Sequence, residues 1–273
     1  MDRHTLTELI KWHFDIGVDE LMADDPIDRT KVKPKKAAPT KAAPAVPKFQ
    51  PPVASDNIGL PPQQSAQQDN PLGAAEAIEA AQKAAAQAND LKSLEQAVQQ
   101  FEGCALSRTA SHMVFGAGAE KPKLMIIGHT PGEEEDLSGQ IFVGAGGLLL
   151  TKMLQAIGLE RDDVYLSNLI YWRPPGNRSI NDAEADMCLP FVQKQIALVQ
   201  PQMIVTMGAL PTQKLLGVTT SIGRSRGKWQ EMQVQDQNLP VMPIFHPDYL
   251  LQNPLQKKQA WQDLQAIQKK LVE

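Results

Sequence analysis

Beyond Lys121 the chain alternates between short apolar runs and longer stretches with helical periodicity. Four apolar runs predict β-strands, over 124–127, 164–168, 203–207 and 241–245. Apolar positions at helical spacing predict helices over 144–158, 182–199, 209–216 and 254–271. Short apolar strands that alternate with helices indicate a parallel sheet covered on both faces. We therefore expect an α/β fold, a three-layer α/β/α sandwich with a four-stranded parallel sheet, and a hairpin or loop over 231–238 beside it.

The residues before 101 follow other patterns and predict three further segments. In residues 1–28 a helix is indicated by one stripe at helical spacing, formed by Leu6, Leu9, Ile10, His13 and Phe14. Residues 29–72 are rich in Pro, Ala and Gln, with almost nothing to bury, which is typical of a disordered or extended linker. Residues 73–100 are rich in Ala, Glu, Gln and Lys, with no internal Pro or Gly, and predict one helix.

A separate domain is therefore expected over 101–273. The candidate site residues described below do not precede Phe101, so we expect a chain that begins near Ala97 to fold. We interpret the N-terminal helix either as a docking segment for a partner protein or as a segment that frays or packs back on the domain.

Composition narrows the class of protein. The 273 residues carry a net charge of −4, which argues against a general polyanion binder and requires any nucleic-acid contact to come from a local basic patch. The sequence has no apolar run of the ~18 residues that a membrane span needs and no export signal at Met1. Two cysteines give no disulfide framework, which fits a reducing compartment. We expect a cytoplasmic monomer without a membrane partner.

The predicted topology brings four strand ends to one rim. In open parallel sheets, ligands bind in the crevice beyond the carboxyl ends of the strands. The residues at these ends are 129–132, Asn168, Gly208 and His246. A polar side chain at several neighbouring strand ends predicts a binding or active site.

A rigid loop follows the second strand, in the segment Asn-Leu-Ile-Tyr-Trp-Arg-Pro-Pro-Gly-Asn-Arg from Asn168 to Arg178. Its two prolines exclude a helix, and Gly176 permits a sharp turn. Arg173 and Arg178 flank the turn and could hold a phosphate backbone, and Asn168 offers the adjacent donor and acceptor that reading a base edge requires. The alternative is an ordinary surface loop with solvated arginines. A Gly-punctuated loop over 221–228, with Arg224 and Arg226, has the same two interpretations.

Three blocks of sequence together resemble the uracil-DNA glycosylase superfamily, and most closely its family-four branch, the bacterial and archaeal iron–sulfur type. They are the 123–150 segment with Gly-His-Thr-Pro-Gly, the Arg-Pro-Pro-Gly-Asn-Arg loop, and the 241–251 segment with His-Pro-Asp-Tyr-Leu-Leu. The resemblance runs from about Phe101 to the C-terminus. It implies a DNA glycosylase that hydrolyses the N-glycosidic bond of uracil, or another deaminated base, in base-excision repair.

The resemblance also implies roles for residues of the rim. Phe142 would stack on an extruded uracil, Asn168 would bond the base edge, and His246 would stabilise charge on the base carbonyl. Gly128 and Pro131 would line the pocket, and Tyr249, Leu250 and Leu251 would wedge into the duplex. Each residue has a structural alternative: a core ring for Phe142, a strand-end cap for Asn168, a buried turn for His246 and a core segment for the Tyr-Leu-Leu run.

The chain departs from the family pattern at the catalytic position. The family has a glutamate after the first Gly of this motif, and the matching residue here is His129. A neutral imidazole can accept a proton from water, but it supplies no negative charge to a cationic sugar. Two hypotheses follow: an active glycosylase with His129, Asn168 and His246 as catalytic residues, or a uracil- or DNA-binding module that hydrolyses weakly or not at all.

The second departure concerns the family's 4Fe–4S cluster, which four cysteines hold. The positions that match them are Phe101, Cys104, Trp172 and Cys188. Since a cubane cluster normally takes four thiolate ligands, we expect no metal and no cofactor, with hydrophobic packing in place of the cluster. Cys104 and Cys188 would then be buried free thiols.

Overall fold

The structure is a computed structural model that describes residues 73–235 and 237–272. The helix predicted in residues 1–28 and the linker predicted over 29–72 lie outside the described residues. Within them, no helix is both long and apolar enough to cross a membrane.

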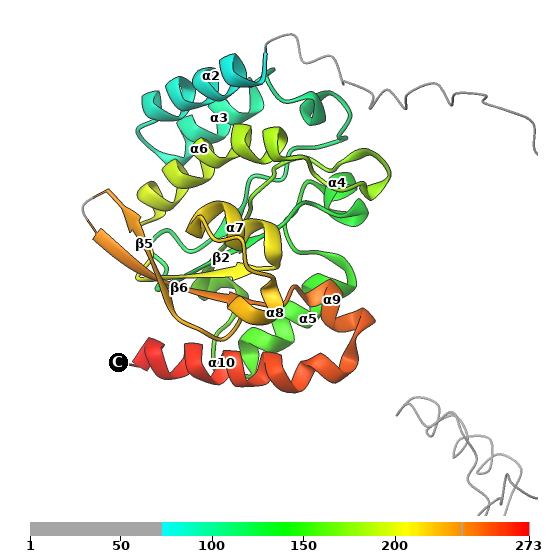
Figure 1. Cartoon of the computed structure of the whole chain (residues 1–273), viewed down its shortest axis with the longest axis vertical. Coiled ribbons are helices and arrows are strands. Elements are labelled where there is room, and N and C mark those ends of the chain that lie inside the picture. The colour runs from blue at the N-terminus through cyan, green and yellow to red at the C-terminus, as the bar shows by residue number, and fades with distance from the viewer. Residues whose placement is uncertain (1–72, 236, 273) are drawn as a thin grey trace, which may run out of the picture. The chain divides into compact units, whose positions relative to one another are not determined.

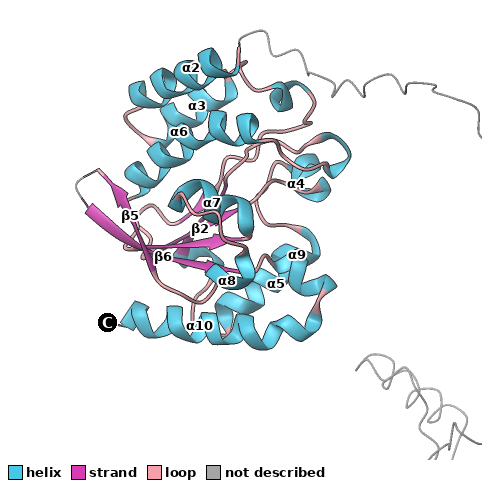
Figure 2. Ribbon diagram, in the orientation of Figure 1, coloured by secondary structure: helices cyan, strands magenta, loops and turns pink. Residues whose placement is uncertain are grey.

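The described chain is built on a six-stranded sheet of order β1-β3-β2-β4-β6-β5 (Figures 1 and 2). The strands are β1 (Ala117–Gly118), β2 (Leu124–Gly128), β3 (Val164–Asn168), β4 (Met203–Met207), β5 (Gln230–Val234) and β6 (Gln237–Ile244). The four central strands run parallel, as predicted, and β1 and β5 add antiparallel edges. The prediction of a four-stranded sheet is thus correct for the parallel core and wrong for the whole sheet. The hairpin expected over 231–238 is the β5–β6 pair.

Helices cover both faces of the sheet, which confirms the three-layer arrangement (Figure 1). One face carries α2 (Ala74–Gln87), α3 (Leu91–Gln99), α6 (Asp182–Val199) and α7 (Ala209–Leu216). The other carries α5 (Gly144–Gln155), α9 (Pro247–Gln252) and α10 (Lys257–Val272). Shorter helices lie in the connections: α4 (Glu133–Ser138), α8 (Ile222–Ser225), and the 3₁₀ turns η1 (Ala105–Arg108), η2 (Arg161–Asp163), η3 (Pro175–Asn177) and η4 (Pro254–Gln256).

The two cores follow from the period of two along each strand. In β2, Met125 and Ile127 face the α6 side, whereas Leu124 and Ile126 face the α5 side. The strands β2, β3 and β4 are buried along their whole length, and β6 is buried from Val241 to Ile244, as expected of a parallel sheet between two helical layers. In such a sheet, polar side chains that contact a ligand are expected at the carboxyl ends of the strands.

The 73–100 segment differs from its prediction in two ways. It forms two helices, because Asp90 caps a new one by accepting the Ser93 amide N–H at 2.7 Å. It is also part of the domain core, since Ala77 and Ala81 of α2 are fully buried in the cluster that includes α6. The expectation that a chain beginning near Ala97 would fold is therefore not supported, because such a chain lacks α2 and most of α3.

Candidate active site

The carboxyl ends of β2, β3 and β6 bring together the residues predicted for the site. Gly128 of β2 is paired with Asn168 of β3, and His246 follows the end of β6. Phe142 comes from the segment before α5, and its ring centroid lies 6.0 Å from that of His246. A Cβ on Gly128 would lie 2.7 Å from Phe142 Cζ and against Asn168 Oδ1, so only glycine fits between them.

Asn168 has a buried amide group without a hydrogen-bond partner. The residue is 1% exposed, and neither Nδ2 nor Oδ1 bonds any group in the described part of the chain. It therefore does not cap the strand end, which was the structural alternative. Leaving a buried polar group unpaired costs about 1–3 kcal/mol, and such groups in native structures call for a ligand or a functional reason. The Asn168 amide can therefore bind a ligand that has a hydrogen-bond donor and a hydrogen-bond acceptor next to each other.

His246 is oriented as a donor toward the cavities that it lines. It is the N-cap of α9, and its Nδ1 accepts the Asp248 amide N–H at 3.3 Å. The neutral ring therefore carries its proton on Nε2. Burial lowers the pKa of His246, and the nearby Asp248 carboxylate, 3.5 Å from Nδ1, opposes that shift.

His129 lies beside His246 as a neutral imidazole. Burial, with a smaller contribution from His246, lowers the pKa of His129 to about 4. The Thr130 hydroxyl lies 3.4 Å from His129 Nδ1. Near neutral pH this ring can accept a proton, but it carries no charge of its own.

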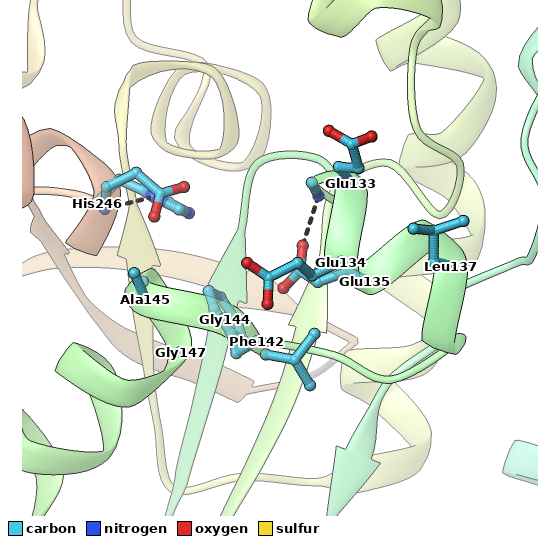
Figure 3. A pocket seen from close by; sticks show the side chains of 13 residues that line it. Glu133, Glu134, Glu135, Leu137, Phe142, Gly144, Ala145, Gly147 and His246 are labelled. Carbon is cyan, nitrogen blue, oxygen red and sulfur yellow. Dashed lines mark hydrogen bonds and ion pairs between the residues drawn. The ribbon is translucent and has the colours of Figure 1, made fainter.

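Two cavities meet at Gly132, His246 and Asp248. The first, of about 440 Å³, lies between α4 and the start of α5 and has acidic walls; Figure 3 shows Glu133, Glu134 and Glu135 on one side and His246 on the other. The second, of about 620 Å³, is lined by His129, Pro131 and part of the loop from Pro174 to Ser179. Both are within the size range of small-ligand sites. Asn168 is not among the residues that line these two cavities, and it borders Gly128, which approaches both Asn168 Oδ1 and the Phe142 ring.

Two of the four predicted DNA-contacting arginines are paired with buried carboxylates. Arg178 makes a two-point bond to Glu184, with Nη1–Oε2 at 2.9 Å and Nη2–Oε1 at 2.6 Å. Arg226 binds both carboxylate oxygens of Asp263 and lies over the Phe245 ring. These two are therefore structural cations, which neither the phosphate-contact interpretation nor the solvated-loop interpretation anticipated.

The other two arginines, Arg173 and Arg224, differ from each other in exposure, and the Arg173 side chain is 20% exposed. Arg173 donates from Nε to Asn177 Oδ1 at 2.8 Å and lies 3.5 Å from the exposed Glu133 carboxylate. Arg224 is exposed on α8. They remain candidates for phosphate contact.

Of the three residues predicted to wedge into the duplex, two lie at the surface and one lies in the core. Tyr249 and Leu251 are each 40% exposed on α9, whereas Leu250 is 1% exposed and packs with the α5 side of the core. Successive residues of a short helix point in different directions, so three in a row cannot all face a ligand. Leu250 is therefore a core residue, which was the structural alternative for the Tyr-Leu-Leu run, rather than part of the predicted wedge.

The four positions that match the family's cluster ligands lie together in the α6-side core. Phe101 and Trp172 are buried, and the Phe101 ring meets Phe191 edge-on at 5.2 Å. Cys104 and Cys188 are buried free thiols, and the hydrogen bond to Cys104, together with burial, raises the pKa of the Cys188 thiol well above its ordinary value. Two thiols with two aromatic rings do not fit a four-thiolate cluster.

Three residues near the site were not predicted from the sequence. Glu135 accepts the Gly132 amide N–H at 2.6 Å, and burial raises the pKa of its carboxyl group. Asp248 lies beside His246, and Arg161 donates to the Phe142 carbonyl O at 2.9 Å. The acidic run 133–136 was the only signal for Glu135, and Arg161 stands in no motif.

The fold and the rim define an α/β/α domain with a polar site at the carboxyl ends of its parallel strands. A family model described as "Uracil DNA glycosylase superfamily" matches residues 115–265. The Archaeoglobus fulgidus protein named type-4 uracil-DNA glycosylase is 36% identical over 168 residues, which cover 60% of this chain and 84% of that protein. Proteins of the same name from Saccharolobus solfataricus and Thermotoga maritima are 35% and 36% identical, over 64% and 57% of this chain and 83% and 80% of their own lengths. The chain belongs to the uracil DNA glycosylase superfamily.

Proposed function

We propose that this protein hydrolyses the N-glycosidic bond of uracil in DNA, as the first step of base-excision repair. The observation that carries the proposal is the unpaired, buried Asn168 amide, whose Oδ1 lies close to Gly128, the residue that also approaches the Phe142 ring. A pyrimidine edge with an adjacent N–H and carbonyl satisfies both of its atoms, and a ring stacked beside it fits a base taken out of the duplex.

The proposed steps use groups already placed at the rim. The extruded base stacks on Phe142 and pairs with the Asn168 amide. As the bond from C1′ to the base breaks, its electron pair goes to the base, and His246 Nε2–H donates to the carbonyl oxygen where charge develops. Water adds to the cationic C1′, and neutral His129 accepts its proton. The products are an abasic site and the base anion, which takes up one proton as it is released and so balances the proton that His129 accepted from water.

We propose that Tyr249 and Leu251 fill the gap that the extruded nucleotide leaves. Both are exposed apolar side chains on α9, directly after His246. Arg173 and Arg224 are the proposed phosphate contacts. The protein is further proposed to act as a cytoplasmic monomer, with residues 1–28 as the segment for any protein partner.

We also propose that the protein works without an iron–sulfur cluster. The support is the set of residues at the four matching positions, where Phe101 and Trp172 replace two ligands. Packed rings would then take over the cluster's structural role.

The test is excision from a uracil-containing oligonucleotide, with alkali to cleave the abasic product. Cleavage at the uracil position, and none in the thymine-containing strand, supports the function. The binding-only alternative is not favoured, since the relatives compared are named glycosylases. Tight, uracil-selective binding without cleavage would reinstate that alternative.

A further inference from the structure

Two charged side chains hold the backbone on both sides of the Phe142 ring. Arg161, from η2, donates from Nη1 to the Phe142 carbonyl O at 2.9 Å and from Nη2 to the Ile141 carbonyl O. The Glu135 carboxylate, from α4, lies close enough to the backbone amides of Phe142 and Val143 for both to lower the pKa of Glu135, against the larger effect of burial, which raises it. The peptide groups before and after the ring are thus fixed from two separate elements.

Phe142 requires such support because its backbone conformation is unfavourable. Its φ is +48°, in the left-handed region that side chains other than glycine rarely adopt. A residue stays in this region only where its surroundings determine its conformation. Without its partners, the 141–143 segment would relax toward other conformations, and the ring would leave its place beside Gly128 and Asn168.

Arg161 and Glu135 also lie close to each other, and Glu135 lies close to the first motif. The Arg161 guanidinium is partly buried, and the Glu135 carboxylate is close enough to oppose the lowering of the Arg161 pKa by burial. Glu135 also binds the Gly132 amide N–H at the start of α4, which ties the first motif to the Phe142 segment. Glu135 therefore links the start of α4 at Gly132 to the segment that carries Phe142.

We infer that Arg161, with Glu135 as its counterpart, is a positioning residue that presets the Phe142 ring to stack on an extruded base beside Asn168. The inference rests on the proposed function. If only a fraction of molecules holds the ring in place, the apparent affinity for the base falls by that fraction, while affinity for undamaged DNA does not change.

A double-mutant cycle of Arg161→Met and Phe142→Ala tests the inference. Two quantities are measured: kcat/KM for uracil excision, and affinity for an oligonucleotide with 2′-fluoro-2′-deoxyuridine, which resists hydrolysis, relative to the same strand with thymidine. Arg161→Met alone is expected to lower kcat/KM and the selective affinity each by about tenfold. When Phe142 is already alanine, Arg161→Met should lower neither kcat/KM nor the selective affinity any further, because Arg161 acts through the Phe142 ring.

Gln268→Ala is the matched control. Gln268 also donates from its side chain to a backbone carbonyl of a distant segment, Ile157 O at 3.1 Å, just beyond the other end of α5. This variant should lower the melting temperature about as much as Arg161→Met does, and leave the selective affinity unchanged.

Effects that multiply in the double variant, or an Arg161→Met protein with the selectivity of the parent, would overturn the inference. If Arg161→Met does not fold, Arg161→Lys replaces it in the cycle. That variant keeps the charge with a single donor, and should show a smaller loss that again disappears beside Phe142→Ala. A parent that neither excises uracil nor prefers the fluorinated strand would instead overturn the proposed function.

Discussion

We propose that base recognition depends on Asn168, whose side-chain amide makes no hydrogen bond within the described protein. Asn168→Ala would remove the proposed hydrogen bonds to the base and no side-chain hydrogen bond within the fold. We predict that uracil excision falls by about 100-fold, as for other single donors to developing charge, while the melting temperature does not fall. Single-turnover excision and thermal unfolding of the same preparations check this. A large drop in melting temperature would show that the amide is structural.

His129 stands where the family places a carboxylate, and its ring is neutral near pH 7. His129→Glu would place a negative charge beside the cationic sugar, so we predict a higher rate of excision at pH 7. The single-turnover rate of His129→Glu is compared with the rates of the parent and His129→Ala. Equal rates for all three would remove this position from the mechanism.

The lowered pKa of His129 also predicts how stability depends on pH. In the unfolded chain this histidine titrates near its reference pKa of ~6.5, and in the folded protein near about 4. Between these values the unfolded state binds more protons, so stability falls as pH falls through that window. His129→Gln should therefore lose less stability than the parent between pH 6.5 and 4. Denaturant unfolding across that range measures the difference, and identical pH profiles would contradict it.

Single residues differ in how far the sequence could predict them. Gly128, Asn168 and His246 end apolar strands, so topology alone placed them at one rim. The pairing of Arg178 with Glu184 and of Arg226 with Asp263 depends on helix packing that no local pattern encodes. The same is true of Arg161, which reaches a segment about twenty residues away.

At the scale of elements, α2 and α3 belong to the core of the domain. Several of their apolar residues, Ala77, Ala81 and Leu94 among them, are fully buried in the cluster that includes α6. We predict that a chain beginning at Gly73 folds and excises uracil, whereas one beginning at Phe101 is insoluble or melts far below it, because the α6 side loses its cover. Thermal unfolding of the two purified chains checks this; equal melting temperatures would contradict it.

The elements also show what a local pattern leaves out. Apolar runs located all four parallel strands, since each of these strands contains at least four consecutive buried residues. The two-residue β1 has no pattern to detect, and Ala117 and Gly118 become a strand only by pairing with β3. The Ala-rich composition of residues 73–100 predicts one helix. The break at Asp90 is not visible in the composition, because Asp90 acts as an N-cap only through its hydrogen bond with Ser93.

At the scale of the whole molecule, packed side chains occupy the region where the family holds its cluster. Phe101, Trp172 and the hydrogen-bonded Cys104–Cys188 pair are all buried there. We predict that anaerobically purified protein is colourless, with no broad absorption near ~400 nm and without stoichiometric iron or sulfide. The control is a protein that retains all four cysteines, purified in parallel. A brown protein with about four irons per chain would contradict this prediction.

The central claim is that this domain removes uracil from DNA through the site around Asn168. Its most direct test is single-turnover excision by the full-length parent and by Asn168→Ala, on matched oligonucleotides with uracil or thymine at one position, single-stranded and paired with guanine. We predict alkali-sensitive cleavage at uracil by the parent, none at thymine, and about 100-fold slower cleavage by the variant. No cleavage by the parent on either uracil substrate, or equal cleavage by parent and variant, would contradict it.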